Sequence, residues 1–405
     1  MIPGRPFVAS ASAMQDTIAV INARLYPITS PVIQNGTMIL AGGKIVAIGR
    51  GLGAPAPARV IDAGGRVVMP GLVESHSHVG LRQLWRPAAR MESNELSEAI
   101  NAGVSALDGI DVTDAGFRQA LQAGVTTVNV TPGSRTPNGG QAVVLKLRGG
   151  SAERMYLAHG GMKLAFRLPG WNRVAYPSSR MAVVGVIREQ LIAAQEYLTR
   201  WRSYETNGRQ GPAPRRDLKL EALGKVLTRE WVVGAHASYD HGPLEMLNAI
   251  RIAKEFQLDL FIHHGRHLVD VVDEVAAAGV PVSFGPVLPL FGRESRDLQG
   301  PVRLAQLGGK VSFHTDSPDG SGAHLRMGAA LFVRAGMSEA DALRALTINP
   351  ASLFRLQGRI GSLEPGKDAD FIILSGEPLE IESFVDQVFI EGVEVFNRAT
   401  GRSVL

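Results

Sequence analysis

The chain contains no cysteine among its 405 residues. Disulfide bonds and thiolate metal ligands are therefore excluded, and any bound metal has to be held by histidine, carboxylate or a modified side chain. No apolar run approaches the length of a membrane span, and the first fifteen residues lack an apolar core of signal-peptide length. We therefore expect a cytoplasmic protein.

Charge of one predominant sign is also missing, because 42 Lys and Arg stand against 38 Asp and Glu and the basic residues are scattered. No stripe of positive charge resembles a nucleic-acid interface, so the expected partner is a small-molecule substrate rather than nucleic acid or a membrane. Apolar residues make up 45% of the chain, which is enough for a large core. The length favours one large domain with a smaller one beside it.

Both ends of the chain have the composition of short β-strands separated by turns. The N-terminal stretch alternates β-rich runs with turn residues such as Gly42. Near the C-terminus, Ala369–Leu374 and Val385–Ile390 repeat this pattern. We therefore predict one small β domain, built from residues 1–70 plus 356–405.

The middle of the chain alternates apolar strand candidates with helical patterns. The strand candidates are Thr126–Val130, Ala142–Leu147, Trp231–Ala235, Leu258–Ile262, Pro281–Phe284 and Lys310–His314. The helix candidates are Asp114–Ala123, Ser179–Trp201, Gly242–Phe256, Leu268–Ala278 and Ser338–Leu346. Such alternation predicts a parallel sheet closed into a (β/α)8 barrel over residues 71–355. The alternative is an open doubly wound sheet, but no glycine-rich dinucleotide loop follows the first strand. Residues 203–218 are expected to form a surface loop.

Histidines and one carboxylate stand where the predicted strands end. His76 and His78 are one residue apart at the end of an apolar run, and alternate side chains of a strand point to the same side. His236, His264 and Asp316 follow three later strands. Because a barrel gathers its chemistry at the C-terminal ends of its strands, we expect these side chains to meet. Nitrogen and oxygen donors of this kind suit a divalent metal, with zinc first and iron or manganese as alternatives, as one or two ions.

Some strand-end residues have more than one interpretation. His263 and His264 are adjacent, so only one of them is expected to point into the barrel mouth. We choose His264, because Gly265 permits the sharp turn that a ligand-bearing loop needs. His314 is ranked behind the metal ligands, as a supporting residue. Asp316 suits a catalytic role better than the alternative of capping the turn that follows it.

The segments Pro70–His78, His236, His264–Gly265, Asp316, Ile348–Ala351 and Gly361–Asp370 together resemble the amidohydrolase superfamily of metal-dependent hydrolases. The resemblance extends over nearly the whole chain. Within the superfamily it is closest to the imidazolonepropionase-like and related uncharacterised amidohydrolases, through Thr131–Ser134 and Gly139–Gln141. It implies a metal-bearing (β/α)8 TIM barrel with a small β-sandwich domain formed by both termini.

The resemblance also implies roles for individual residues. The metal ligands that it implies are His76, His78, His236, His264 and Asp316. Binuclear members use a carbamylated lysine to bridge two metals, for which Lys163 is the candidate and Lys146 a rival. Two positions depart from the pattern: Glu74 stands where an aspartate is common, and Ser317 where a histidine is frequent.

The expected activity is hydrolysis of an amide or ring C–N bond of a small molecule. Metal-activated water attacks an sp² carbon, Asp316 moves the proton from water to the leaving nitrogen, and His264 stabilises the oxyanion. Four residues on strand-end loops are candidates for binding the substrate: Gln141, Tyr239, Arg266 and His267.

Three other functions compete with this interpretation. A deaminase of the same superfamily places a glutamate soon after the fifth-strand histidine, where this chain offers only Asp240. A prolidase-like dipeptidase is the second alternative. A non-catalytic barrel is the third, although such proteins usually lose ligands that this chain keeps. A homo-oligomer is compatible with all of them.

Overall fold

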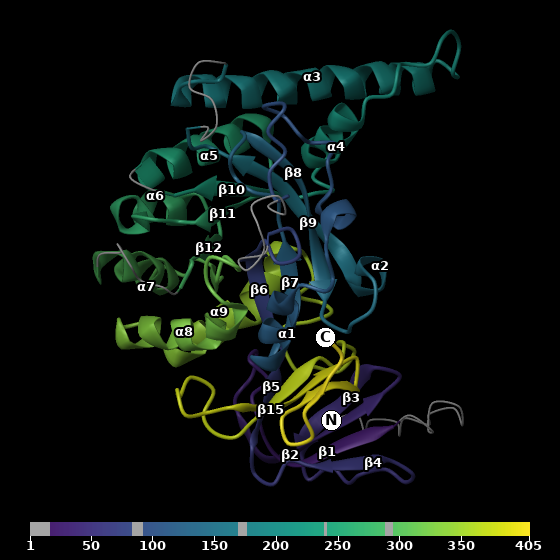
Figure 1. Ribbon diagram of the computed structural model, residues 1–405, viewed down its shortest axis with the longest axis vertical. Helices are drawn as coiled ribbons and strands as arrows, with labels where there is room; N and C mark the ends of the chain where they lie inside the picture. The colour runs from purple at the N-terminus through teal and green to yellow at the C-terminus, as the bar shows by residue number, and fades with distance from the viewer. Residues whose placement is uncertain (1–16, 83–91, 169–175, 239–240, 288–294) are drawn as a thin grey trace, which may run out of the picture.

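The computed structural model describes residues 17–82, 92–168, 176–238, 241–287 and 295–405. These residues form two sheets, one of nine strands and one of eight. Figure 1 shows the nine-stranded sheet at the lower end, with the C-terminus of the chain beside it, and the eight-stranded sheet above it among most of the helices.

The nine-stranded sheet is built from both ends of the chain. Its strands are β1 (Ile18–Leu25), β2 (Ile33–Ala41), β3 (Lys44–Arg50), β4 (Arg59–Asp62), β5 (Val67–Pro70), β14 (Phe371–Leu374), β15 (Val385–Ile390), β16 (Val393–Asn397) and β17 (Arg402–Ser403). β14 pairs antiparallel with β5 and so joins the two groups of strands. Phe371 and Phe389 stack with ring centroids 4.4 Å apart in a core that also holds Leu25 and Met38. The sandwich formed by both termini is confirmed, whereas the boundaries 1–70 plus 356–405 stay a prediction.

The eight-stranded sheet curves into a nearly closed barrel. Its strands follow chain order: β6 (Leu72–Ser77), β7 (Val125–Val130), β8 (Asn138–Lys146), β9 (Tyr156–Ala165), β10 (Val233–Ala237), β11 (Leu260–His264), β12 (Val282–Phe284) and β13 (Val311–Phe313). The two edge strands meet, because the Ser75 hydroxyl donates to the Phe313 carbonyl at 2.9 Å. The same hydroxyl lies 2.7 Å from that of Ser283 across the barrel. The predicted barrel is confirmed.

One strand of the barrel runs against the others. β8 pairs antiparallel with both β7 and β9, although the alternation of elements predicted a parallel sheet. Parallel neighbours need a crossover of a dozen or more residues, whereas antiparallel ones accept a short loop. Residues 131–137 are too few for a crossover, so β8 turns back along β7. Its first residues therefore lie at the end of the barrel where the parallel strands finish.

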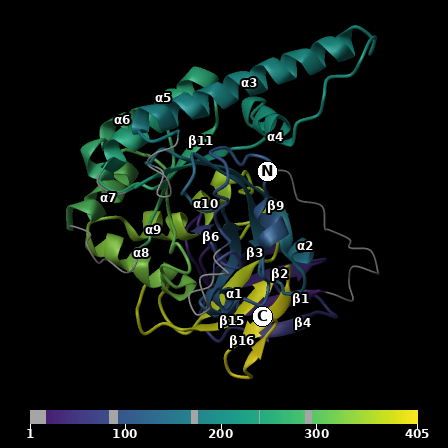
Figure 2. The ribbon, with the colours of Figure 1, turned by 45° about the horizontal axis from the view of Figure 1, so that its top comes forward.

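The helices surround the barrel. They are α1 (Ala115–Gln122), α2 (Ala152–Met155), α3 (Arg180–Thr206), α4 (Leu218–Leu227), α5 (Gly242–Phe256), α6 (Val272–Ala277), α7 (Gln299–Gln306), α8 (Leu325–Arg334), α9 (Glu339–Leu346) and α10 (Ile348–Leu353). Short 3₁₀ helices cover Ala106–Gly109, Leu268–Asp270, Ser295–Leu298 and Gly322–His324. Figure 2 shows α3 reaching across the barrel and beyond it, with α4 and α5 beside it. Within the described residues, no helix combines the length and the apolar character that crossing a membrane requires.

Two predicted segments differ in detail from the structure. The helix expected over Leu268–Ala278 is divided at Val271 into a 3₁₀ turn and α6. The loop expected at 203–218 is shorter, because α3 continues to Thr206 and the Asp217 carboxylate accepts hydrogen bonds from backbone N–H groups at the start of α4.

Lys146, at the end of β8, lies in a buried ion cluster between the two sheets. Its ammonium group is 2.7 Å from Asp368, 2.9 Å from Asp370 and 3.1 Å from Glu391. The side chain is fully buried, and its charge is balanced by these carboxylates. Lys146 is therefore occupied in joining the barrel to the sandwich and does not bridge metals.

Candidate metal centre

β6 carries His76 into the barrel, and His78 follows the last residue of the strand. Both histidines approach one oxygen of Asp316, at 3.1 Å from His76 Nε2 and 3.5 Å from His78 Nε2. The three residues are buried, and each offers a ligand atom within 4.8 Å of the others. His78 Nδ1 lies 2.6 Å from the carbonyl oxygen of Thr131, so this nitrogen donates and Nε2 keeps its lone pair. A metal ion needs this arrangement of converging, unprotonated donors.

Glu74 supports the turn that carries Asp316. Its buried carboxyl accepts hydrogen bonds from the Thr315 amide at 3.1 Å and from the Thr315 hydroxyl at 2.7 Å. Burial raises the pKa of Glu74 to about 8, although the bonds from Thr315 act in the opposite direction. Asp316 itself has φ +58°, a left-handed conformation that the surrounding contacts must maintain. Glu74 is thus a positioning residue below the cavity.

The two adjacent histidines at the end of β11 point to different places. His264 has φ +73°, and it is followed by Gly265 at φ +60°, so the chain turns sharply and His264 reaches the cavity. His263 lies deeper, with Nδ1 3.0 Å from Nδ1 of His76. Sequence reasoning expected one of the pair to face the barrel mouth, and His264 is the one that lines the cavity.

His236, on β10, is held by two serine hydroxyls. Ser134 Oγ is 2.7 Å from its Nδ1, and Ser238 Oγ is 2.7 Å from its Nε2. The ring lies 4.3 Å from that of His264 between centroids, but His236 is not among the three residues that converge on one point. Binding a metal would require His236 to exchange one hydroxyl contact for the ion.

Two further buried groups adjoin the three converging residues. The His314 ring lies 4.8 Å from that of His76 and 4.9 Å from that of His264 between centroids. Lys163, on β9, is 1% exposed, and its amine has no hydrogen-bond partner in the described part of the chain. Burial lowers the pKa of Lys163 to about 7, against the opposing effect of Asp316. Burial likewise holds the pKa of His76 well below its usual value, which favours the neutral, ligating imidazole.

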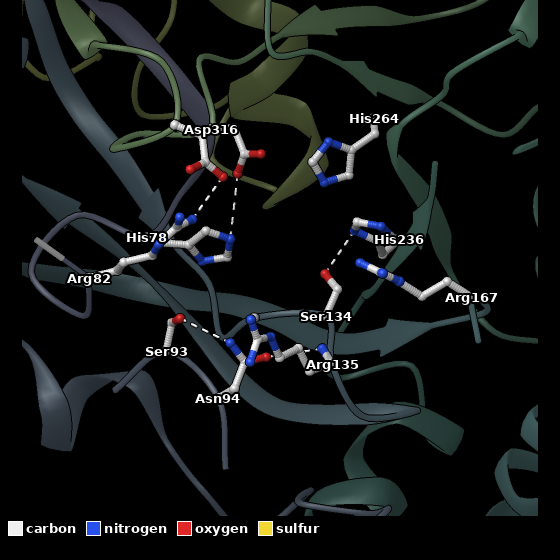
Figure 3. Close-up of a pocket in the computed structure, with 12 residues that line it drawn as sticks. His78, Arg82, Ser93, Asn94, Ser134, Arg135, Arg167, His236, His264 and Asp316 are labelled. Carbon is white, nitrogen blue, oxygen red and sulfur yellow. Dashed lines mark hydrogen bonds and ion pairs between the residues drawn. The ribbon is translucent and has the colours of Figure 1, made fainter. Parts of the chain in front are cut away.

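A cavity of about 320 Å³ opens above these residues. Figure 3 shows Asp316, His78, His264 and His236 on its walls. The other described residues that line it are Arg82, Ser93, Asn94, Gly133, Ser134, Arg135, Arg167 and Asp319. No aliphatic side chain is among them, so the part of the cavity that the structure describes suits a polar ligand.

Gln141, Arg266 and His267, which the sequence suggested as substrate-binding residues, are not among the residues that line this cavity. The Gln141 side chain donates to the Ala102 carbonyl at 2.9 Å, and His267 Nδ1 is 3.2 Å from the buried carboxylate of Asp297. Tyr239 lies outside the described residues. Gln141 and His267 therefore have structural partners in place of a ligand.

Sequence reasoning missed the arginines around the cavity. Arg82 comes four residues after His78, and Arg167 comes two residues after the end of β9. Arg135 follows Ser134 in the short β7–β8 loop. Their positions next to strand ends were the available signal, but arginine is common on exposed loops and β8 was expected to run in the opposite direction.

A nearly closed barrel whose strand ends bring His76, His78 and Asp316 together defines a barrel hydrolase of the metal-dependent class. The chain belongs to the amidohydrolase family, whose model matches residues 67–395. It resembles the crystal structure of an amidohydrolase from Thermotoga maritima MSB8, with a TM-score of 0.88 and 33% identity, over 94% of this chain and all of that one. The resemblance expected from the sequence motifs is thus confirmed.

Two curated relatives are similar to the chain at lower sequence identity. The imidazolonepropionase of Sphingopyxis alaskensis is 26% identical, over 89% of this chain and 92% of its own length. The amidohydrolase tasK of Hapsidospora irregularis is also 26% identical over 89% of this chain, which spans only 40% of that longer protein. The chain is therefore an enzyme of the hydrolase class related to proteins that act on C–N bonds.

Proposed function

We propose that the protein hydrolyses an amide or ring C–N bond of a small polar molecule, with water activated by a divalent metal. The observation that carries the proposal is the convergence of His76, His78 and Asp316 beneath a polar cavity. The donor set fits the metal: two neutral imidazoles and a carboxylate are preferred ligands of zinc, with iron or manganese as alternatives.

The residues that would hold the first ion are His76, His78 and Asp316, with His236 and His264 on the adjoining strand ends. Lys163 would contribute to a second ion if its amine reacted with carbon dioxide to give a carbamate. A pKa of about 7 supports this reaction, since the neutral amine is the form that attacks carbon dioxide. Its buried amine, which lacks a hydrogen-bond partner in the described ranges, is the orphaned group that such a modification would satisfy.

A divalent ion held by His76, His78 and Asp316 would lower the pKa of water toward neutrality and so would supply hydroxide for attack on the substrate carbon. Asp316 accepts the proton of the attacking water and transfers it to the leaving nitrogen. Burial alone would raise the pKa of Asp316, but the neighbouring histidines and Lys163 hold it well below its usual range, so the carboxylate starts ionised. His264 lines the cavity beside Asp316 and donates to the oxygen that gains charge.

The alternatives receive less support. Glu245, on α5, is buried and accepts a hydrogen bond from the Ser238 amide at 3.0 Å, but it does not line the cavity. It therefore does not replace the glutamate that a deaminase would use, and Asp240 lies outside the described residues. No described contact favours a dipeptidase. The hydrolase relatives argue against a non-catalytic barrel.

The test is an assay of the purified protein with a cyclic amide such as hydantoin, linear N-acyl amides, an aminopurine and an Xaa-Pro dipeptide. Metal content is measured in parallel. We expect amide or lactam hydrolysis that is lost on chelation and restored by zinc, manganese or iron. If the metal-replete protein only releases ammonia from the aminopurine, it is a deaminase. If it only cleaves the dipeptide, it is a dipeptidase. Cytoplasmic location and homo-oligomerisation stay predictions.

A further inference from the structure

We propose that the substrate carries a carboxylate group, which Arg135 and Arg167 bind on the side of the cavity away from Asp316. The inference rests on the proposed function for the chemistry at the other end of the substrate, and it adds the chemical class of that substrate. Figure 3 shows the two arginines on either side of Ser134, with Asp316 and His264 across the cavity.

The charges around the cavity support an anionic ligand. The carboxylates among its described lining residues are Asp316, which belongs to the metal centre, and Asp319. Asp319 already pairs with Arg82 at 2.7 Å. Arg135 is exposed to the cavity and makes no ion pair with any residue in the described ranges. Arg167 adds a second guanidinium group to the same wall, beside His236. A ligand carboxylate would give Arg135 an ion-pair partner at this wall of the cavity.

The loop that carries Arg135 favours a carboxylate over a phosphate. Phosphate sites commonly use several free backbone N–H groups. Here the Gly133 amide donates to the Ser93 carbonyl at 2.5 Å, and the Arg135 amide donates to Asn94 Oδ1 at 3.0 Å. The Ser134 hydroxyl is engaged with His236. The groups of this wall that we expect to bind the ligand are therefore the guanidinium groups of Arg135 and Arg167. A planar guanidinium matches the two oxygens of a carboxylate.

The same bonds place Arg135 with precision. Because Ser93 and Asn94 hold Gly133 and Arg135, the loop is fastened at two points next to the residue that contacts His236. Ser134 and Arg135 are adjacent, so the loop that positions a histidine of the centre also presents a cation to the ligand. Specificity and metal-site geometry therefore depend on one segment, and a carboxylate bound there would orient the scissile bond toward Asp316.

The experiment measures binding of matched ligand pairs to the metal-loaded protein by calorimetry. Each pair is the monoamide and the diamide of succinic, glutaric or adipic acid, which differ only in one carboxylate. We expect at least one monoamide to bind about tenfold or more tightly than its diamide, and R135Q and R167Q each to remove about tenfold of this preference. R200Q is the control, because Arg200 is an exposed residue of α3 that pairs with Glu196. It should leave the preference unchanged.

Two results would overturn the inference. One is equal binding of monoamide and diamide at all three chain lengths. The other is a preference that survives in the R135Q/R167Q double variant, which would assign the carboxylate to the metal ion. A phosphonate analogue that binds more tightly than the monoamide, with the same arginine dependence, would overturn the choice of carboxylate.

The carboxylate site and the proposed reaction can be contradicted independently of each other. Arginine-dependent binding of a monoamide without hydrolysis of any amide would support the carboxylate site and contradict the reaction. Metal-dependent hydrolysis that treats carboxylated and neutral amides alike would support the reaction and contradict the carboxylate site.

Discussion

His78 Nδ1 lies 2.6 Å from the Thr131 carbonyl oxygen, while Nε2 of the same ring faces Asp316 at 3.5 Å. The carbonyl can only accept, so the proton sits on Nδ1 and the lone pair of Nε2 is directed toward the metal centre. The first residue after β7 thus sets the tautomer of the histidine that follows β6.

Substituting Asp316→Asn tests the proton transfer. The amide keeps the shape and an oxygen donor but cannot accept the proton of water, so we expect kcat to fall by about 10²- to 10⁴-fold. Asp319→Asn is the matched control, because Asp319 lines the same cavity but pairs with Arg82. Steady-state kinetics at equal metal occupancy checks this. Unchanged kcat in Asp316→Asn would exclude the carboxylate as the proton shuttle.

Substituting Glu74→Ala tests the support of the aspartate turn. The change leaves the Thr315 amide and hydroxyl without their acceptor, so we expect metal affinity to fall by about 10- to 100-fold. Glu74→Gln retains an acceptor and should recover part of the affinity. Competition with a metal chelator measures both. Equal affinity of wild type and Glu74→Ala would show that the turn holds Asp316 without this carboxyl.

The two fully buried lysines should respond in opposite ways to replacement by methionine. Lys146→Met leaves Asp368, Asp370 and Glu391 without their central cation, which should cost about 3–5 kcal/mol in the free energy of unfolding. Lys163→Met removes an amine without a hydrogen-bond partner among the described residues, and should be neutral or stabilising in the metal-free protein. Urea unfolding at pH 7 compares them, and equal losses would contradict the contrast.

Lys163 has a second, independent test in metal stoichiometry. If its carbamate bridges two ions, the wild type reconstituted with zinc and bicarbonate should bind two equivalents and Lys163→Met one. Elemental analysis after gel filtration measures the ratio. Identical stoichiometry in the two proteins would show that Lys163 does not bridge two ions.

The side chain of His159 should make the folded protein less stable in mild acid. Its ring stacks on Trp231 with centroids 3.6 Å apart, and burial lowers its pKa to about 4 from 6.5. Below pH 6.5 the unfolded chain takes up a proton that the folded protein refuses until about pH 4, so stability falls across that window, by up to about 3 kcal/mol. His159→Phe should flatten this part of the profile. If the difference in the free energy of unfolding between the wild type and His159→Phe does not change between pH 7 and 4.5, the effect does not come from His159.

The sequence was informative wherever function depends on short-range periodicity. A strand repeats every two residues, so His-x-His at the end of an apolar run places both rings on one side, as found for His76 and His78. Strand ends of a barrel share one face, so His264 and Asp316 could be expected near them. The closing segment Gly361–Asp370 also supported the family assignment from the sequence, because it is a contiguous motif.

Other features depended on contacts that no local pattern records. Lys146 and Lys163 look alike along the chain. They differ because Lys146 contacts Asp368, 222 residues away, whereas the Lys163 amine has no hydrogen-bond partner in the part of the chain that the structure describes. The reversed direction of β8 brought Arg135 to the cavity, where a parallel sheet was expected. The sequence by itself therefore determined the family and the barrel, and it named His76, His78 and Asp316, which the structure brings together. Only the tertiary structure decided which lysine is paired and which arginines line the cavity, because charge balance and cavity walls are made by residues distant in the chain.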